Sequence, residues 1–189
     1  MIPYQPMVPG ITVYGQTIGV FFDVLKSFAV LQQAMLEVLE VREVDPEHWY
    51  PQELVLRAYQ KVDFLLGGRG LERFGRQVPP LVVFPPGIAD AHAVLEKLDV
   101  TFHLNHRRDG VAMFDLATGE MTEGIGHYRY ERVGEREGLM CSDNPYPCRF
   151  DMGLIHGFVA RFATDVVVTH EPGECRSKNG SHCLYRARW

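Results

Sequence analysis

The spacing of apolar residues changes once along this 189-residue chain, near residue 107, and this change limits the folds open to it. Before that point, apolar residues recur every three or four positions, as on one face of an amphipathic helix. After it, short β-branched and aromatic runs alternate with turn residues, which is typical of strands. Helices followed by strands predict an α+β class, with an antiparallel-leaning sheet and one packed helix. We expect one domain over residues 1–189, with a helical half (11–106) and a sheet half (107–189).

The helical half predicts four helices, joined by segments rich in proline and glycine. Their expected ranges are Phe21–Leu39, Gln52–Leu66, Leu71–Arg76 and Ile88–His103. Gly67-Gly68 is a typical signal for the C-terminal end of a helix. The prolines of Met1–Gly10 indicate an extended arm, and those of Val78–Gly87 an extended connector, because proline cannot donate to a β-ladder.

The sheet half predicts four or five strands and one long helix, Arg149–Ala163. The expected strands are Val111–Leu116, Ile125–Val133, Gly138–Ser142, Val166–Thr169 and His182–Trp189. The turns that separate the first three strands lie at Ala117–Glu120 and Gly134–Glu137. Each expected strand is short and bounded by turn residues, as in a small antiparallel sheet.

Composition excludes several classes of function. With 19 basic and 24 acidic residues the net charge is −5, and no basic stripe indicates a nucleic-acid partner. No apolar run is long enough to span a bilayer. The N-terminus lacks the pattern of a signal peptide, so we expect a cytoplasmic protein. No nucleophile elbow, phosphate-binding loop or dinucleotide fingerprint is present, and we therefore do not expect an enzyme.

All four cysteines lie within Met140–Trp189. Cys148, Cys175 and Cys183 each stand beside turn residues at the edge of an expected element, where side chains can converge. In a reducing compartment, clustered cysteines serve metal or redox chemistry more often than disulfides, and sulfur-rich tetrahedral sites favour zinc. The alternatives are ordinary buried cysteines, or two disulfides in an oxidising compartment.

The last quarter of the chain resembles the 4-vinyl reductase-like domains, which are related in fold to TRAPP transport-complex subunits. The resembling residues are Asn144–Cys148, Gly153, Gly157, Val166–Thr169, Glu171, Cys175, Gly180 and Cys183. The resemblance implies a structural zinc held by Cys148, Glu171, Cys175 and Cys183. Glu171 stands one residue further from Cys175 than the pattern expects, which makes Glu174 a competitor. Cys141 is the alternative fourth ligand.

The order of elements is also similar to that of haem nitric-oxide/oxygen-binding (H-NOX) domains. That resemblance implies a haem held by one histidine late in the helical half, for which His103 is the match. The haem-carboxylate motif Tyr-x-Ser-x-Arg has only a distant counterpart in Tyr128–Arg132. His103 and His106 lie three residues apart and could share a helical face. The simpler interpretation makes His103 a core residue and His106 a helix-end residue.

The sequence therefore predicts a sensory module that binds a small apolar or aromatic ligand in its helical half and carries a structural zinc. The aromatic residues available there are Trp49, Tyr50, Tyr59, Phe64, Phe74 and Phe84. Such residues line ligand pockets, but they also fill cores. The resemblance and the apolar Phe21–Leu39 stripe predict a homodimer that acts through a separate effector. The alternatives are a haem-binding gas sensor using His103 and a non-catalytic, TRAPP-like scaffold.

Overall fold

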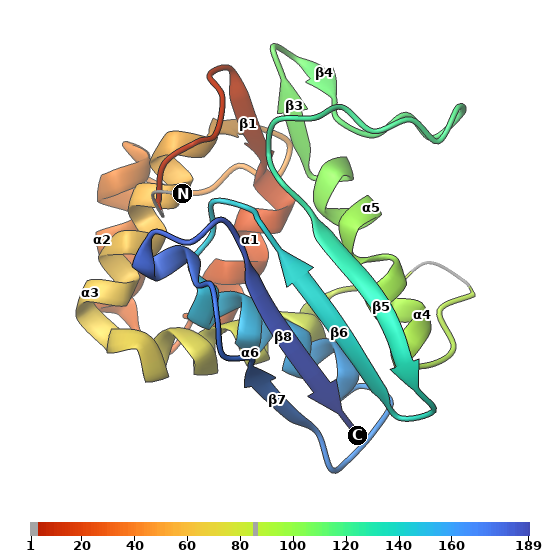
Figure 1. Ribbon diagram of the computed structural model, residues 1–189. Helices are drawn as coiled ribbons and strands as arrows, with labels where there is room; N and C mark the ends of the chain where they lie inside the picture. The colour runs from red at the N-terminus through yellow and green to blue at the C-terminus, as the bar shows by residue number, and fades with distance from the viewer. Residues whose placement is uncertain (1–3, 85–86) are drawn as a thin grey trace.

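A computed structural model describes residues 4–84 and 87–189 of the chain (Figure 1). The helices are α1 (Gly15–Val24), α2 (Ala29–Leu39), α3 (Gln52–Gln77), α4 (Ala91–Glu96), α5 (Leu98–Leu104) and α6 (Cys148–Val159), with short 3-10 turns η1 (Pro79–Leu81) and η2 (Arg176–Lys178). The strands are β1 (Ile11–Tyr14), β2 (Trp49–Pro51), β3 (His106–Arg108), β4 (Val111–Ala112), β5 (Tyr128–Gly134), β6 (Glu137–Ser142), β7 (Val167–His170) and β8 (Cys183–Arg188). The α+β class is confirmed, with most helices in the first half and antiparallel sheets.

The prediction of one helix over Phe21–Leu39 is wrong, because the chain turns between α1 and α2. The backbone N–H of Phe28 donates to the carbonyl of Leu25 at 2.7 Å, closing a turn that separates the two helices. The turn lets Phe21 and Leu31 both enter the core, where each is under 8% exposed. A single helical face could therefore not be read from the apolar spacing alone.

Helix α3 consists of two helical segments that meet at the glycine pair where the sequence predicted a helix end. Gly67 has φ 68° and ψ 170°, a conformation outside the helical region that glycine adopts without steric cost. It produces a kink, and the chain resumes its helical path toward Gln77. The separately predicted helix Leu71–Arg76 is the second half of this kinked helix.

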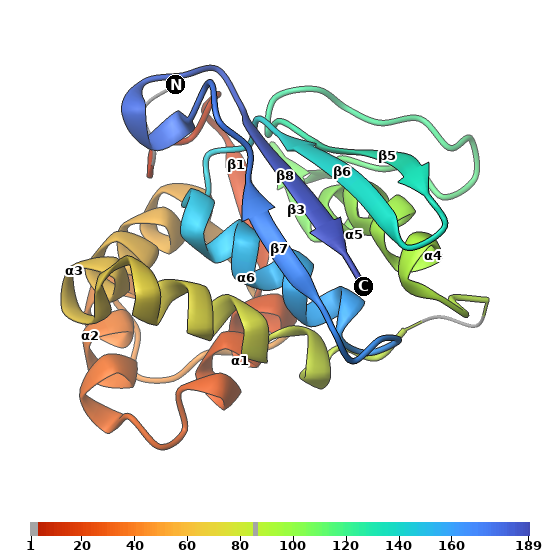
Figure 2. The same ribbon diagram turned by 60° about the horizontal axis from the view of Figure 1, so that its bottom comes forward.

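Helices α3 and α6 pack against each other at backbone contact. A Cβ atom added at Gly75 would lie 2.4 Å from the carbonyl oxygen of Phe150, and one added at Gly153 would lie 2.0 Å from that of Glu72. Only glycine fits at either position without moving one of the helices. Figure 2 shows the result: α6 lies between α3 on one side and the larger sheet on the other.

The larger sheet has the strand order β5-β6-β8-β7, and all its pairs are antiparallel. Alternate residues of its central strands are buried, as the two-residue period of a sheet with one solvated face requires. Met140 and Tyr185 are register partners and are both at most 1% exposed. This sheet agrees with the predicted one, except that Val111–Leu116 does not belong to it.

A second sheet, β2-β1-β3-β4, was not predicted. It pairs β1, near the N-terminus, with strands from both halves of the chain, and each member has only two to four residues. Strands this short carry no periodicity that a sequence window could detect. Of the expected arm Met1–Gly10, the first three residues lie outside the described part of the chain. The N–H of Tyr4 donates to the carbonyl of Pro145.

Buried residues from both halves form one hydrophobic cluster, so the helices and the larger sheet share a core. Within the described residues, no helix has the length and apolar character needed to cross a bilayer.

Candidate functional site: an apolar cavity and a cysteine cluster

A cavity of about 360 Å³ lies between α1, the end of α3, α5 and α6. Its volume falls in the lower part of the roughly 300–1,000 Å³ range of small-molecule pockets. The lining side chains are Val13, Gln16, Thr17, Val20, Phe21, Tyr59, Val78, Leu81, Val82, Val83, Leu98, Thr101, Phe102, Asn105, His106, Tyr128, Tyr146, Phe150, Leu154 and Phe158. None of these described lining residues is a lysine, arginine, aspartate or glutamate, so the cavity suits an uncharged ligand.

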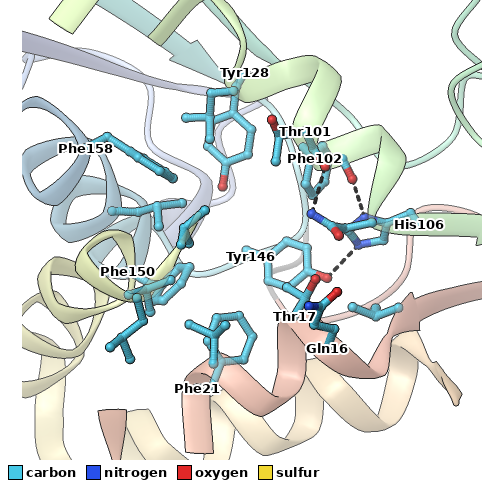
Figure 3. Close-up of a pocket in the computed structure, with 18 of the residues that line it drawn as sticks. Gln16, Thr17, Phe21, Thr101, Phe102, His106, Tyr128, Tyr146, Phe150 and Phe158 are labelled. Carbon is cyan, nitrogen blue, oxygen red and sulfur yellow. Dashed lines mark hydrogen bonds between the residues drawn. The ribbon is translucent and has the colours of Figure 1, made fainter. Parts of the chain in front are cut away.

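The two ends of the cavity differ in character (Figure 3). Phe21, Phe150 and Phe158 form one end, and Gln16, Thr17 and His106 lie at the other. Val83 also lines the cavity and is 91% exposed, so the cavity reaches the surface. A ligand with an apolar body and one polar group would match this division.

The polar end is built on a histidine–tyrosine pair. Nδ1 of His106 lies 2.7 Å from the carbonyl oxygen of Phe102, which can only accept, so Nδ1 carries the proton. Nε2 therefore accepts from the hydroxyl of Tyr146 at 2.8 Å. Burial lowers the pKa of His106 to about 4, and it raises the pKa of Tyr146. Both side chains are neutral near pH 7.

Tyr59 contributes a buried hydroxyl that has no hydrogen-bond partner among the described residues. The residue is 1% exposed, lines the cavity, and packs edge-on against Phe150 with ring centroids 4.8 Å apart. Burial raises its pKa well above the ordinary value, so the hydroxyl stays protonated. An unpaired buried hydroxyl costs roughly 1–3 kcal/mol, which a ligand that accepts its hydrogen bond would recover.

His103, the predicted haem ligand, does not face this cavity. The α5 residues that line it are Leu98, Thr101 and Phe102. His103 is fully buried on another side of the helix, with its ring 5.0 Å from that of His127. The sequence predicted one helix over Ile88–His103, which the structure divides into α4 and α5, and the apolar spacing could not show which side chains of α5 turn inward.

The cavity lining does not fit a haem. A haem iron needs a ligand such as an imidazole nitrogen, and the only described histidine in the lining, His106, has both nitrogens engaged. The distant counterpart of the haem-carboxylate motif offers no cation to the cavity. The Tyr128 hydroxyl donates to Asp151 at 2.6 Å, and the exposed Arg132 donates to the carbonyl of Gly134.

Three of the predicted zinc ligands converge. The sulfur of Cys175 lies 4.0 Å from that of Cys148 and 3.9 Å from that of Cys183, and all three fall within 4.8 Å of one another. Zinc–sulfur bonds of about 2.3 Å in a tetrahedron place sulfur atoms roughly 3.8 Å apart. The Cys148 thiol and Arg176 lower the pKa of Cys183, which favours the thiolate that binds metals.

The proposed fourth ligands lie apart from this cluster. The carboxylate of Glu171 pairs with Nε of Arg186 at 3.2 Å, and that of Glu174 accepts from Ser181. Cys141 stands opposite Leu184 in the sheet, whereas Cys183 stands opposite Ser142. Because neighbouring residues on a strand point to opposite faces, Cys141 and Cys183 face away from each other.

His170 was not selected from the sequence, but it contacts Tyr185, which in turn binds the backbone of Cys148. Its ring packs edge-on against Tyr185 with centroids 5.3 Å apart, and the Tyr185 hydroxyl donates to the carbonyl of Cys148. Nε2 of His170 is buried without a partner. No motif marks this histidine, because the pairing of β7 with β8 is what brings it there.

A buried ion pair connects the cysteine cluster with the cavity wall. Arg176, 1% exposed, pairs with Asp151 of α6, and its Nε lies 3.5 Å from the sulfur of Cys183. Asp151 also accepts from the cavity residue Tyr128 and from Ser142 at 3.0 Å. No sequence pattern predicts this pair, since the two residues are 25 positions apart in unrelated elements.

Solved structures with a similar fold are H-NOX proteins. An H-NOX protein from S. oneidensis in the Fe(II)NO ligation state aligns with a TM-score of 0.66 and 15% identity, over 93% of this chain and 98% of that one. A point mutant of T. tengcongensis H-NOX aligns with a TM-score of 0.60 and 18% identity, over 91% and 94%. This chain has an H-NOX-like fold. Known protein families and curated proteins yield no match to the sequence.

The H-NOX-like resemblance stated from the sequence is thus confirmed for the fold. A structure described as probing the function of haem distortion in the H-NOX family gives the same result, with a TM-score of 0.64 at 18% identity over 93% of this chain and 94% of that one. The resemblance to 4-vinyl reductase-like and TRAPP-like proteins stays a prediction.

Proposed function

We propose that this chain is a sensory module of H-NOX-like fold that binds a small, uncharged, mainly apolar ligand in its cavity. The unpaired hydroxyl of Tyr59 in the cavity wall carries this proposal. It offers a hydrogen bond beside Phe21 and Phe150, and a mainly apolar lining with a few polar groups is the usual composition of a ligand pocket. The ligand would place its apolar part among the phenylalanines and a carbonyl, ether or hydroxyl oxygen on Tyr59.

A haem-binding gas sensor is the second candidate, and the fold is what favours it. Two structures similar to this chain are an H-NOX protein in the Fe(II)NO ligation state and one that probes haem distortion in the H-NOX family. The cavity lining argues against this candidate, because His103 does not line the cavity and both ring nitrogens of His106 are hydrogen-bonded. We therefore place the uncharged ligand first.

We further propose that Cys148, Cys175 and Cys183 hold a structural zinc. The spacing of their sulfur atoms supports this, and a closed site with a fourth protein ligand has no open position for catalysis. The fourth ligand is Glu171 or Cys141, as the sequence suggests, or His170, as the packing of β7 suggests.

The module would act through a separate effector protein in the cytoplasm, as a homodimer and without enzymatic activity of its own. The non-catalytic scaffold remains the alternative from another class. Small-molecule binding distinguishes the two, because a scaffold needs no ligand in its cavity.

The deciding experiment combines absorbance with ligand screening on the purified protein. We expect no Soret band after purification and no stoichiometric band after titration with haemin. We expect uncharged aromatic compounds with one oxygen acceptor to raise the melting temperature of the wild type. Phe150→Asp, which places a charge in the apolar end, should abolish that shift. A one-to-one haem complex would instead support the haem-binding gas sensor. If no compound raises the melting temperature, the scaffold is favoured.

A further inference from the structure

A second group of metal-ligating side chains lies away from both the cavity and the cysteines. Asp99 and His103 belong to α5, and His127 immediately precedes β5. Ligand atoms of these three residues all lie within 4.8 Å of one another. Their side chains are largely withdrawn from solvent, at 18%, 0% and 11% exposed.

His103 has a ring nitrogen that the protein itself leaves without a partner. Its Nδ1 lies 2.9 Å from the carbonyl oxygen of Asp99 and must therefore donate the hydrogen. That tautomer leaves Nε2 with a lone pair, and this atom is buried with no hydrogen bond to any residue of the described ranges 4–84 and 87–189. A histidine whose Nδ1–H is held by a backbone carbonyl is oriented for metal binding through its other nitrogen.

Asp99 and His127 are held in place by their own neighbours. One carboxylate oxygen of Asp99 accepts from the N–H of Tyr128 at 2.9 Å, and the other lies 2.9 Å from Nδ1 of His127. The far nitrogen of His127, Nε2, lies 3.1 Å from the carboxylate of Glu123. A carboxylate on the outer nitrogen of a ligating histidine is a common supporting contact in metal sites.

We propose that Asp99, His103 and His127 bind a divalent transition-metal ion, with zinc as the ion best suited to two imidazoles and one carboxylate. Glu123 would orient His127. A protonated His127 between two carboxylates accounts for its own contacts without a metal, but it leaves Nε2 of His103 unsatisfied. Three protein ligands leave one coordination position for water or another donor.

The ion would tie α5 to the segment between β4 and β5. Residues 113–127 contain no named strand or helix; they form a loop closed by the isolated bridge Phe114–Met121 and by backbone hydrogen bonds such as that from the N–H of Asp115 to the carbonyl of Glu120 at 2.9 Å. Glu123 and His127 are at the end of this segment, and another side of α5 lines the cavity through Phe102. Binding would therefore order the segment beside the cavity without occupying it.

Metal stoichiometry tests the site on the full chain. The protein is stripped with a chelator and titrated with Co²⁺, whose thiolate complexes absorb in the near ultraviolet and so report the cysteine cluster separately. We expect the wild type to bind two equivalents of Co²⁺. Cys183→Ser should bind one equivalent, and His127→Gln should bind one equivalent with the thiolate absorption band retained. His92→Gln is the matched control, since His92 is a buried histidine bonded to Tyr130 and to a backbone carbonyl.

Other outcomes are equally decisive. If the wild type binds one equivalent of Co²⁺ that is lost in His127→Gln and kept in Cys183→Ser, the result supports this site and shows that the cysteines hold no metal. The proposal is overturned if the wild type binds no metal, or if it binds one equivalent of Co²⁺ that Cys183→Ser abolishes. Neither result uses His127→Gln, so neither depends on whether that variant folds. Circular dichroism and the second variant His103→Gln control for folding.

Discussion

Tyr59 and Tyr128 both line the cavity, and they differ in what their hydroxyl groups bind. The Tyr128 hydroxyl donates to Asp151, whereas that of Tyr59 is unpaired. We expect Tyr59→Phe to leave the ligand-free protein as stable as the wild type, or up to ~2 kcal/mol more stable, because an unsatisfied buried group is removed. Ligand affinity should fall about fivefold, for the loss of one hydrogen bond of ~1 kcal/mol.

Tyr128→Phe is the control for that substitution. It should cost about 1–3 kcal/mol, because it leaves an acceptor of the buried Asp151 without its donor. Chemical unfolding of both variants measures the difference. A Tyr59→Phe protein destabilised as much as Tyr128→Phe would show that the Tyr59 hydroxyl has a partner in solution.

His106 makes the stability of the protein depend on pH. Burial lowers its pKa to about 4, below the ordinary 6.5 that it regains on unfolding. Between these values the unfolded chain binds the extra proton, so stability rises with pH and is lost as pH falls from 6.5 to 4. Since one pKa unit corresponds to about 1.4 kcal/mol, the free energy of unfolding at pH 5 is about 2 kcal/mol lower than at neutral pH.

Urea unfolding of the wild type and of His106→Gln at pH 7.5 and pH 5 isolates this contribution, since all other titrating groups are common to both proteins. The wild type should lose about 2 kcal/mol more than the variant between the two pH values. Equal losses would mean that His106 is accessible to protons in the folded state.

At the scale of elements, the cysteine cluster joins the start of α6 to η2 and β8. If zinc binds there, its binding free energy becomes folding free energy, because no site exists in the unfolded chain. Cys183→Ser should then lose the metal of this cluster and several kcal/mol of stability, against ~1 kcal/mol for an ordinary substitution. Metal analysis and thermal melting measure both. An unchanged melting curve would indicate plain cysteines.

The fourth zinc ligand follows from a matched set of substitutions. Cys141→Ser, Glu171→Gln and His170→Gln each remove one candidate, and only the variant that loses the ligand should lose zinc affinity in a chelator competition. We expect His170→Gln to be that variant, because its Nε2 is buried without a partner while the Glu171 carboxylate is bound to Arg186. Reduced zinc affinity in Cys141→Ser would instead require the Cys141 side chain to turn to the opposite face of β6.

For the whole molecule, the predicted homodimer needs a different interface from the one expected. Most of the Phe21–Leu39 stripe packs within the chain, where Phe21 and Met35 are 6% and 2% exposed, although Phe28 is 55% exposed. Other exposed apolar residues of the helical region include Val30 of α2, at 77%, and Phe64 of α3, at 82%. Such exposure on neighbouring helices is what a partner subunit would cover.

Light scattering should return twice the chain mass of 21.5 kDa at micromolar concentration. Phe64→Ser should shift the equilibrium toward monomer, and Leu116→Ser, equally exposed on the sheet half at 79%, should not. A wild-type mass of 21.5 kDa would refute the dimer.

The sequence alone determined the class, the order of the elements and the identity of three clustered cysteines. These follow from local properties: the period of apolar residues, the positions of glycine and proline, and side-chain chemistry beside turns. The strands of the larger sheet and helix α6 were predicted within a few residues for the same reason. The local signals failed at Leu25–Phe28, where the chain turns between α1 and α2, whereas Gly67 interrupts the helical backbone as its sequence signal predicted.

Tertiary structure alone decided which side chains meet. It turned Phe102 rather than His103 toward the cavity, paired Arg176 with Asp151, and brought His127 to Asp99 across 28 positions of sequence. It also separated Cys141 from the other cysteines through the alternation of a strand. A sequence pattern reports the period of an element, whereas the rotation and register of that element depend on contacts with residues distant in the chain.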